Sequence, residues 1–511
     1  MPADAVTLPD APSPTSGAVR AETPVLVAWG AVGQRRADHE HALDAVGLMA
    51  EAARRMLPDA LREIVLPEVD WVAATDGSAH TDDPARLVAR AIGAPRARTV
   101  LAKVGVMQQT LVSEACRRVQ AGEARLALVT GGEARYRAMR ARAAGALPTP
   151  ASAGTEPDEV LEPQAELVLR CEVAAGLHGA PGFYALLDSE WRHRHGASPA
   201  AQREQLGRLY ARFAEVAADN PLAVRRRRYA PEYLREGSAD NPMLAFPYTK
   251  LMITTWTVDQ AAALLFTTAG VATELGIPPE RWLFPVVAVE SNFMAPTAAR
   301  LRLTQPSAMR TMAEAAQRTA GVDTASVEVL ELYSCFPVAV QVAAEGLGVP
   351  AGRDLTVTGG MSFAGGPFNN FVFQAMAAVA DRLSAPSALG PPPERALISC
   401  VSGLYTKQGF TVLSRTPPPV PFAVVDVTAA VERDEPVLAV EDRPAGPATV
   451  VAATVLFDAG APGRAVAVVA CDSGCRTVAR SEDPAVMAAC TTEDVVGRRT
   501  TVADGVFCFE D

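Results

Sequence analysis

The side chains best suited to chemistry in this sequence are a small set of thiols. Eight cysteines are spread along 511 residues, and Met1 to Glu22 lacks the basic start and apolar core of a secretion signal, which favours reduced thiols. The last four, Cys471, Cys475, Cys490 and Cys508, follow the spacing C-x3-C-x14-C-x17-C without a histidine. Structural zinc usually shows tighter cysteine pairs, so this spacing predicts no metal site.

Lysine and histidine are also scarce. Only Lys103, Lys250 and Lys407 are lysines among 47 Lys and Arg residues, and a chain that prefers arginine keeps lysine where a compact ammonium group matters. The six histidines are His39, His41, His80, His178, His193 and His195. The spacing of two within each close pair points their side chains to different helix faces, which favours surface positions over a metal site.

Charge and motif content exclude several classes of function. The 47 basic residues against 58 acidic ones give a net charge of −11, and a nucleic-acid binder requires a basic surplus. The sequence contains neither the glycine-rich patterns of nucleotide hydrolases and dinucleotide oxidoreductases nor the G-x-S-x-G elbow of hydrolases. No apolar stretch approaches the roughly 20 residues of a membrane-spanning helix. We therefore expect a soluble, cytosolic protein.

Short apolar strands alternate with helices from Pro24 onward, which predicts an α/β protein with parallel sheets covered by helices. The same alternation of strands and helices begins again at WLFPVVAVES, so we predict two similar halves, residues 23–285 and 286–416. Within the first half, residues 143–243 depart from this alternation, which indicates an inserted loop domain.

Both ends of the chain depart from this alternation. Residues 1–22 are rich in Pro, Ala, Ser and Thr and are predicted to be disordered. After the stiff linker TPPPVP, residues 422–511 contain short strands and turns that predict a small appended β-barrel-like domain.

Six motifs in order make the sequence resemble the thiolase superfamily: PVLVAWG, GEARLALVTGGEA, NPMLAFPYTKLM, VEVLELYSCFP, TGGMSFAGGPFNN and SGLYTK. More narrowly, they resemble a thiolase-like subgroup, type 1, that carries an extra C-terminal domain and is often labelled acetyl-CoA acetyltransferase. The resemblance covers about 23–511 and implies duplicated βαβαβ halves in α/β/α/β/α layers. Thiolases are generally dimers or tetramers, but the insertion and the extra domain leave the oligomeric state open.

The resemblance implies four catalytic loops, of which two have lost their reactive groups. The family's nucleophilic cysteine begins a helix, but the matching stretch 105–109 reads GVMQQ, and Cys116 lies too far along that helix and is expected in the core. The family's Gly-His-Pro becomes Gly365-Gly366-Pro367. Losing such a nucleophile or its base reduces the rate on the order of 10⁶-fold, so conventional thiolysis or Claisen condensation is not expected.

The other two loops keep candidate catalytic side chains. Tyr333 and Cys335 occupy the loop that places a polar group over the thioester oxygen in thiolases; filling a strand end is the alternative. Cys400 falls near the family's second cysteine. With Lys407 or Tyr405 it is the best remaining acid/base group, and a buried structural thiol is the alternative.

Binding of coenzyme A can outlast the loss of turnover. Backbone N–H groups of the glycine-rich loops at Gly359, Gly360, Gly365 and Gly366 are candidates for a thioester oxygen. The phosphates and adenine of coenzyme A match the run Arg225, Arg226, Arg227 and Arg228 with Tyr229, although such a run is often a solvated face. Lys250 is a candidate contact for pantetheine or phosphate.

Three hypotheses follow. The first is a thiolase-fold protein that binds coenzyme A or an acyl-CoA without a tightly bound cofactor, has lost thiolase catalysis, and serves as an accessory or sensor in acyl-CoA or lipid metabolism. The second is an acyltransferase that uses Cys400 or Cys335. The third is a non-catalytic subunit that docks a protein partner through the appended domain or the former catalytic face.

Overall fold

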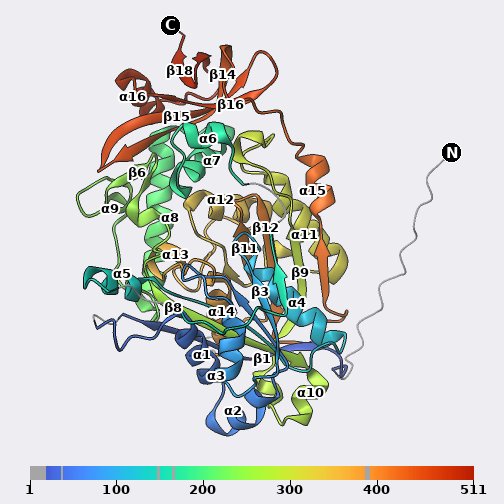
Figure 1. Cartoon of the computed structure of the whole chain (residues 1–511). Helices are drawn as coiled ribbons and strands as arrows, with labels where there is room; N and C mark the ends of the chain where they lie inside the picture. Colours follow the sequence, from blue (N-terminus) through green and yellow to red (C-terminus); the bar gives the residue numbers. More distant parts are fainter. Residues whose placement is uncertain (1–18, 36–37, 147–149, 164–166, 386–391, 511) are drawn as a thin grey trace, which may run out of the picture.

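The computed structural model describes residues 19–35, 38–146, 150–163, 167–385 and 392–510. These residues form three β-sheets with helices between and around them (Figure 1). The disorder predicted for residues 1–22 falls mostly outside the described ranges, so it stays a prediction. No helix in the described part of the chain is both long and apolar enough to cross a membrane.

The first sheet has six strands in the order β1, β8, β4, β2, β3, β5. Strands β1 and β4 run antiparallel to β8, whereas β2, β3, β4 and β5 run parallel to one another. Its strands are β1 (Pro24–Gln34), β2 (Trp71–Thr75), β3 (Arg98–Ala102), β4 (Ala127–Ala134), β5 (Glu159–Leu161) and β8 (Asp259–Thr268).

The second sheet repeats this arrangement. Its order is β10, β11, β12, β9, β13, so β9, β12, β11 and β10 match β1, β8, β4 and β2 in order and direction. This match confirms the predicted duplication. The strands are β9 (Phe284–Ser291), β10 (Val329–Glu331), β11 (Arg395–Ser402), β12 (Lys407–Ser414) and β13 (Ala423–Asp426).

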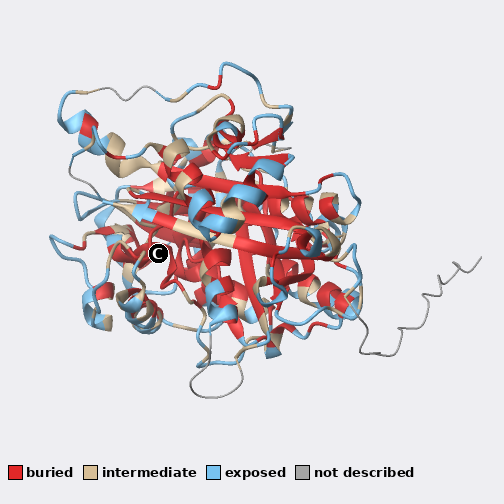
Figure 2. Cartoon of the chain, turned by 90° about the horizontal axis from the view of Figure 1, so that it is seen from below, coloured by how far each residue is buried: buried red, intermediate tan, exposed pale blue. Residues whose placement is uncertain are grey.

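Helices complete the predicted layers. Helices α4 (Gln108–Gln120) and α14 (Phe371–Ser384) lie between the sheets and contact strands of both, while α1 (Ala45–Arg55) and α3 (Pro84–Ala91) cover the first sheet. The second sheet is covered by α11 (Pro306–Ala320), which in turn contacts α12 (Pro337–Gly346). Figure 2 shows strands running through the middle of the molecule as mostly buried, with exposed residues gathered on the outer helices and loops.

The remaining helices are short or belong to the predicted insertion. They are α2 (Asp59–Val65), α5 (Arg135–Ala143), α6 (Arg170–Ala174), α7 (Ala180–Arg194), α8 (Pro199–Asp219), α9 (Pro231–Arg235), α10 (Ala269–Glu274), α13 (Gly360–Phe363), α15 (Thr428–Asp434) and α16 (Pro484–Thr492). Capping fixes the start of α8, for example, because the Ser198 hydroxyl accepts the Ala201 N–H at 3.2 Å and Pro199 takes the first helical position.

The predicted barrel is confirmed as a closed ring of five strands, seen at the top of Figure 1. Strand β14 pairs with β15 and β17, and the ring closes through β16 and β18. These strands are β14 (Gly446–Asp458), β15 (Ala461–Cys471), β16 (Arg476–Ser481), β17 (Arg499–Ala503) and β18 (Val506–Phe509). Strands β6 (Met243–Ala245) and β7 (Tyr248–Thr249), at the end of the insertion and just after it, extend the same sheet beyond β14. The insertion itself packs against the barrel through α7, which contacts β14.

Candidate functional site

Two buried glutamines occupy the helix start where the thiolase resemblance would place a nucleophile. The side-chain oxygen of Gln108 accepts the Val372 N–H of α14 at 2.7 Å, and the Gln109 amide donates to the Val289 carbonyl of β9 at 3.1 Å. Both glutamines therefore connect the start of α4 to the other half of the molecule. They serve as structural ties and offer no nucleophile.

The structure brings Cys400 and Lys407 to this same helix start. The Cys400 thiol is fully buried within reach of the backbone N–H groups of Gln108 and Gln109, and Lys407 Nζ donates to the Gly105 carbonyl at 3.0 Å. Burial raises the pKa of Cys400 to about 12 and lowers the pKa of Lys407. Tyr405 points elsewhere, with its hydroxyl donating to the Ala339 carbonyl at 3.4 Å.

Tyr333 lies close to Cys335 and Cys400, and burial raises its pKa well above the ordinary value. The Tyr333 N–H donates to Ser399 Oγ at 2.8 Å, and its ring meets the edge of Phe371. Cys335 is buried beside Tyr184, and burial raises its pKa to about 12. At neutral pH the Tyr333 hydroxyl and the Cys335 and Cys400 thiols therefore stay protonated. Acyl transfer to Cys335 or Cys400 would need a thiolate, which is absent under these conditions.

The glycine loop has no room for an imidazole. A Cβ atom at Gly366 would stand 2.3 Å from Thr254 Cγ2, and one at Gly365, where φ is +108°, would stand 2.3 Å from Gln260 Oε1. The N–H groups of Gly359, Gly360 and Gly366 already donate to Thr356, Thr358 and Thr255, respectively. These three N–H groups are therefore engaged within the protein.

The four consecutive arginines do not converge on one point. Arg225 Nε donates to Thr255 Oγ1 at 3.2 Å, whereas Arg226 Nε donates to the Ala218 carbonyl. The Arg227 guanidinium lies over the Tyr229 ring, and Arg228 pairs with Asp219 at 3.1 Å. Lys250 is exposed at the start of a single helical turn, residues Lys250–Met252.

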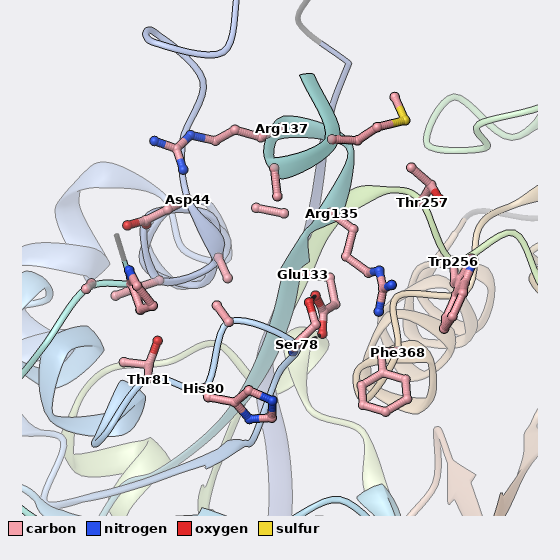
Figure 3. Close-up of a pocket in the computed structure, with 18 of the residues that line it drawn as sticks. Asp44, Ser78, His80, Thr81, Glu133, Arg135, Arg137, Trp256, Thr257 and Phe368 are labelled. Atoms are coloured by element: carbon pink, nitrogen blue, oxygen red, sulfur yellow. Dashed lines mark hydrogen bonds between the residues drawn. The ribbon is translucent and has the colours of Figure 1, made fainter. Parts of the chain in front are cut away.

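A cavity of about 870 Å³ borders two of the four loops (Figure 3). Val104 comes from the first loop and Phe368 from the glycine loop, while Trp256 and Thr257 precede β8. Helix α5 supplies Arg135, Arg137 and Arg142.

Of the three cavity arginines, Arg137 is engaged through Nε, which donates to the His39 carbonyl at 3.2 Å. Among the described residues, no carboxylate lies within 4.0 Å of the guanidinium groups of Arg135, Arg137 or Arg142. The Arg135 guanidinium lies 4.0 Å over the Trp256 ring, and Figure 3 shows Phe368 on the same side of the cavity. A planar group and phosphate oxygens could share this end of the cavity.

The cavity also contains one deeply buried acid. Glu133 is 1% exposed and accepts hydrogen bonds from the Ser78 N–H at 2.8 Å and the Ser78 hydroxyl at 2.5 Å. Burial raises the pKa of Glu133. Nearby, Asp76 lies 3.7 Å from His80 Nδ1 and 3.8 Å from Lys103 Nζ, so one of the three lysines stands beside this cavity.

The cavity arginines were not among the predicted site residues, although their spacing carried a signal. Arg135 and Arg142 are seven residues apart, which places them on one face of a helix that directly follows the strand ending GGEA. Glu290 was not predicted either; it is buried near Lys407 and accepts the Thr110 hydroxyl at 3.1 Å. In the described part of the chain, no three Cys, His, Asp or Glu side chains gather as a metal site would require.

Glu290 should make stability depend on pH. Burial raises its pKa to about 7 from an ordinary value of 4.5, so between these values the unfolded chain releases a proton that the folded chain keeps. The contribution of Glu290 to the free energy of unfolding is therefore greatest below pH 4.5 and is lost as the pH rises from 4.5 through 7. We expect the free energy of unfolding to lose about 3 kcal/mol from Glu290 between about pH 4 and pH 8.

Urea unfolding at several pH values measures this effect. Glu290→Gln should flatten the slope, whereas Glu314→Gln, at an exposed carboxylate of α11, should leave it unchanged. Equal slopes in the native chain and Glu290→Gln would contradict the assignment.

Comparison with known proteins places the fold. Neither the protein-family models nor the curated proteins give a match. Among solved structures, the chain is similar to a monomeric SCP2-thiolase like protein type 1 from Mycobacterium smegmatis, with 27% identity, a TM-score of 0.78, and coverage of 96% of this chain and 99% of that one.

Two other solved structures share the fold at lower identity. Human mitochondrial 3-ketoacyl-CoA thiolase in complex with CoA gives 14% identity and a TM-score of 0.54 over 78% of this chain and 99% of that one. The Ltp2-ChsH2(DUF35) aldolase gives 15% identity and a TM-score of 0.56 over 77% of this chain and 98% of that one.

Proposed function

The chain belongs to the thiolase superfamily, in the thiolase-like type 1 subgroup, and we propose that it binds coenzyme A or an acyl-CoA without catalysing thiolysis. In this proposal it is a cytosolic accessory or sensor protein of acyl-CoA or lipid metabolism.

The observation that carries this proposal is the contrast between a filled catalytic centre and an open cavity beside it. Gln108 and Gln109 are tied into the core, and a side chain at Gly366 would collide with Thr254. Yet the adjoining cavity keeps about 870 Å³ and three arginines without carboxylate partners among the described residues. Such a cavity supports ligand binding where the catalytic groups are gone.

Coenzyme A suits the chemistry of this cavity. Its phosphates match the forked guanidinium donors of Arg135, Arg137 and Arg142, and its adenine ring can stack on the half-exposed Trp256. Its pantetheine arm would then run toward Val104 and Phe368, the cavity residues nearest the former catalytic loops.

Titration calorimetry with coenzyme A and acetyl-CoA tests this assignment. We expect binding with a Kd below about 1 mM, and replacement of Arg135, Arg137 and Arg142 together by glutamine should weaken it about 100-fold, because each charge-assisted contact contributes about 1 kcal/mol. The matched control replaces Arg226, Arg227 and Arg228 by glutamine and should leave the affinity within about threefold.

The two arginine variants separate the possible outcomes. Loss of coenzyme A binding in the control variant alone would assign the phosphate site to the arginine run, residues 225–228, in place of the cavity. No binding by the native chain at millimolar ligand would remove the proposal altogether.

One observation favours the acyltransferase as a second candidate. The Cys400 thiol lies at the α4 start, where two backbone N–H groups partly offset the burial that raises its pKa. Incubation with a labelled acyl-CoA would then leave a covalent label that Cys400→Ala removes and Cys116→Ala, at an equally buried thiol, retains.

A protein partner is a third candidate, because one fold neighbour is solved as a two-protein aldolase. Affinity capture with the full chain as bait would test this candidate. A partner that docks through the barrel should be captured less well by Arg476→Ala, which loses the contacts to the Arg300 and Leu301 carbonyls.

A further inference from the structure

Two of the barrel cysteines close a tight hairpin. Cys471 ends β15 and Cys475 immediately precedes β16, with only Asp472, Ser473 and Gly474 between them. The Gly474 N–H donates to the Cys471 carbonyl at 2.9 Å, and the Cys471 N–H donates to the Cys475 carbonyl at 2.9 Å. Gly474 has φ +93°, the left-handed conformation that ends a three-residue hairpin loop.

This geometry places the two cysteines directly opposite each other. The ladder pairs Ala470 with Arg476, so Cys471 and Cys475 form the next pair at the turn. Opposed residues of an antiparallel pair have Cα atoms about 4.5–5.5 Å apart. That separation lies within the range of about 4.4–6.8 Å that a disulfide spans without backbone movement.

The side chains are arranged to match. The Cys471 thiol lies beside that of Cys475, and Ser473 Oγ lies 3.4 Å from Cys475 Sγ. Cys471 is partly exposed whereas Cys475 is buried, so a reagent from solution meets Cys471 first. The other barrel cysteines, Cys490 and Cys508, have no cysteine opposite them in the ladder.

We propose that Cys471 and Cys475 are a redox-active pair that closes to an intramolecular disulfide by exchange with a low-molecular-weight disulfide. The Cys471 thiolate attacks one sulfur of the reagent, a mixed disulfide forms and one reagent thiolate leaves. Cys475 then loses its proton and attacks the Cys471 sulfur, which expels the second reagent thiolate. Two protein thiols are oxidised, and one reagent disulfide is reduced to two thiols.

The site adjoins the attachment of the barrel to the thiolase halves. Arg476, the next residue, donates from its guanidinium to the carbonyls of Arg300 and Leu301. The disulfide would therefore fix the hairpin that carries this attachment. Burial and the neighbouring thiol raise the pKa of Cys471 to about 12, so exchange at neutral pH is slow and should be followed over hours.

The experiment uses the full chain and glutathione disulfide as the probe. After incubation, free thiols are alkylated and the protein is digested with trypsin, which releases AVAVVACDSGCR, residues 465–476, with both cysteines and no other. We expect this peptide to become two hydrogens lighter and resistant to alkylation, and to regain both thiols after reduction. The exposed single thiol of Cys508 is the internal control and should carry a glutathione adduct.

Variants make the result specific. Cys475→Ser should trap glutathione on Cys471, whereas Cys490→Ser should leave the intramolecular disulfide unchanged. A 465–476 peptide that stays unmodified over the hours of incubation, although Cys508 has fully reacted, would overturn the proposal, and so would a stable glutathione adduct on Cys471 in the native chain.

Discussion

Thiolysis of acetoacetyl-CoA should stay undetectable even when the two missing groups are restored together as Gln108→Cys and Gly366→His. A nucleophile and its base act as a unit whose loss reduces the rate on the order of 10⁶-fold, so both must be placed correctly to recover it. The structure prevents this, because a Cβ atom at Gly366 would stand 2.3 Å from Thr254 Cγ2 and 3.0 Å from the Met361 terminal methyl. Gln108→Cys would also leave the Val372 N–H without its acceptor.

Unfolding experiments show whether lack of space is the reason. Gly366→Ala should destabilise the chain by about 1–3 kcal/mol through overpacking. The matched background is Thr254→Ser, which removes the colliding methyl group but keeps the hydroxyl that donates to the Cys335 carbonyl. In that background Gly366→Ala should be milder by about 1 kcal/mol or more. Equal losses of unfolding free energy in both backgrounds would show that Thr254 does not limit the space at Gly366. In the thiolysis assay, activity of the native chain that Cys400→Ala abolishes would favour the acyltransferase.

The layered fold was predictable because its signals are local. Strand β9, with all eight residues buried, reads as an apolar run, and β1 does so over its first half, while the helices between strands show their own period. The duplication was visible for the same reason, since each half repeats the same short elements. The barrel followed from the short, closely spaced strands and turns of residues 422–511.

The contents of the site were less predictable because they depend on residues far apart in the sequence. The absence of a thiol at 105–109 and of a histidine at Gly366 can be read directly, but the Gln108 bond to Val372 spans 264 positions. Likewise, nothing near Gly366 indicates that Thr254 fills its neighbourhood. Catalytic roles for Tyr333, Cys335, Cys400 and Lys407 and ligand contacts by the arginine run remain predictions.

Arg300→Met is expected to lower the free energy of unfolding by about 3–5 kcal/mol, since it breaks a buried charged network. Arg300 is 1% exposed, and its guanidinium donates to the carbonyls of Ala295 at 3.0 Å, Leu303 at 3.1 Å and Leu404 at 2.9 Å. It is also the main cationic neighbour of the fully buried Glu172, whose pKa is raised by burial. Methionine fills a similar volume but leaves three carbonyls and one carboxyl without this partner.

The consequences should extend to the fourth loop and the barrel. Leu404 has φ +52° in the turn before Lys407, and its carbonyl is held by Arg300, while the Arg300 carbonyl itself accepts from Arg476 of the barrel. Arg300→Lys should not rescue stability, because a single ammonium group cannot reproduce the planar fork that reaches three carbonyls.

Arg310→Met, at an exposed arginine of α11, is the matched control and should change stability by no more than about 0.5 kcal/mol. Urea midpoints, together with the rate of tryptic cleavage after Arg476, report global stability and the barrel attachment separately. If the Arg300 and Arg310 variants unfold at the same urea concentration, the fourth loop and the barrel must be held to the second half by contacts other than this arginine.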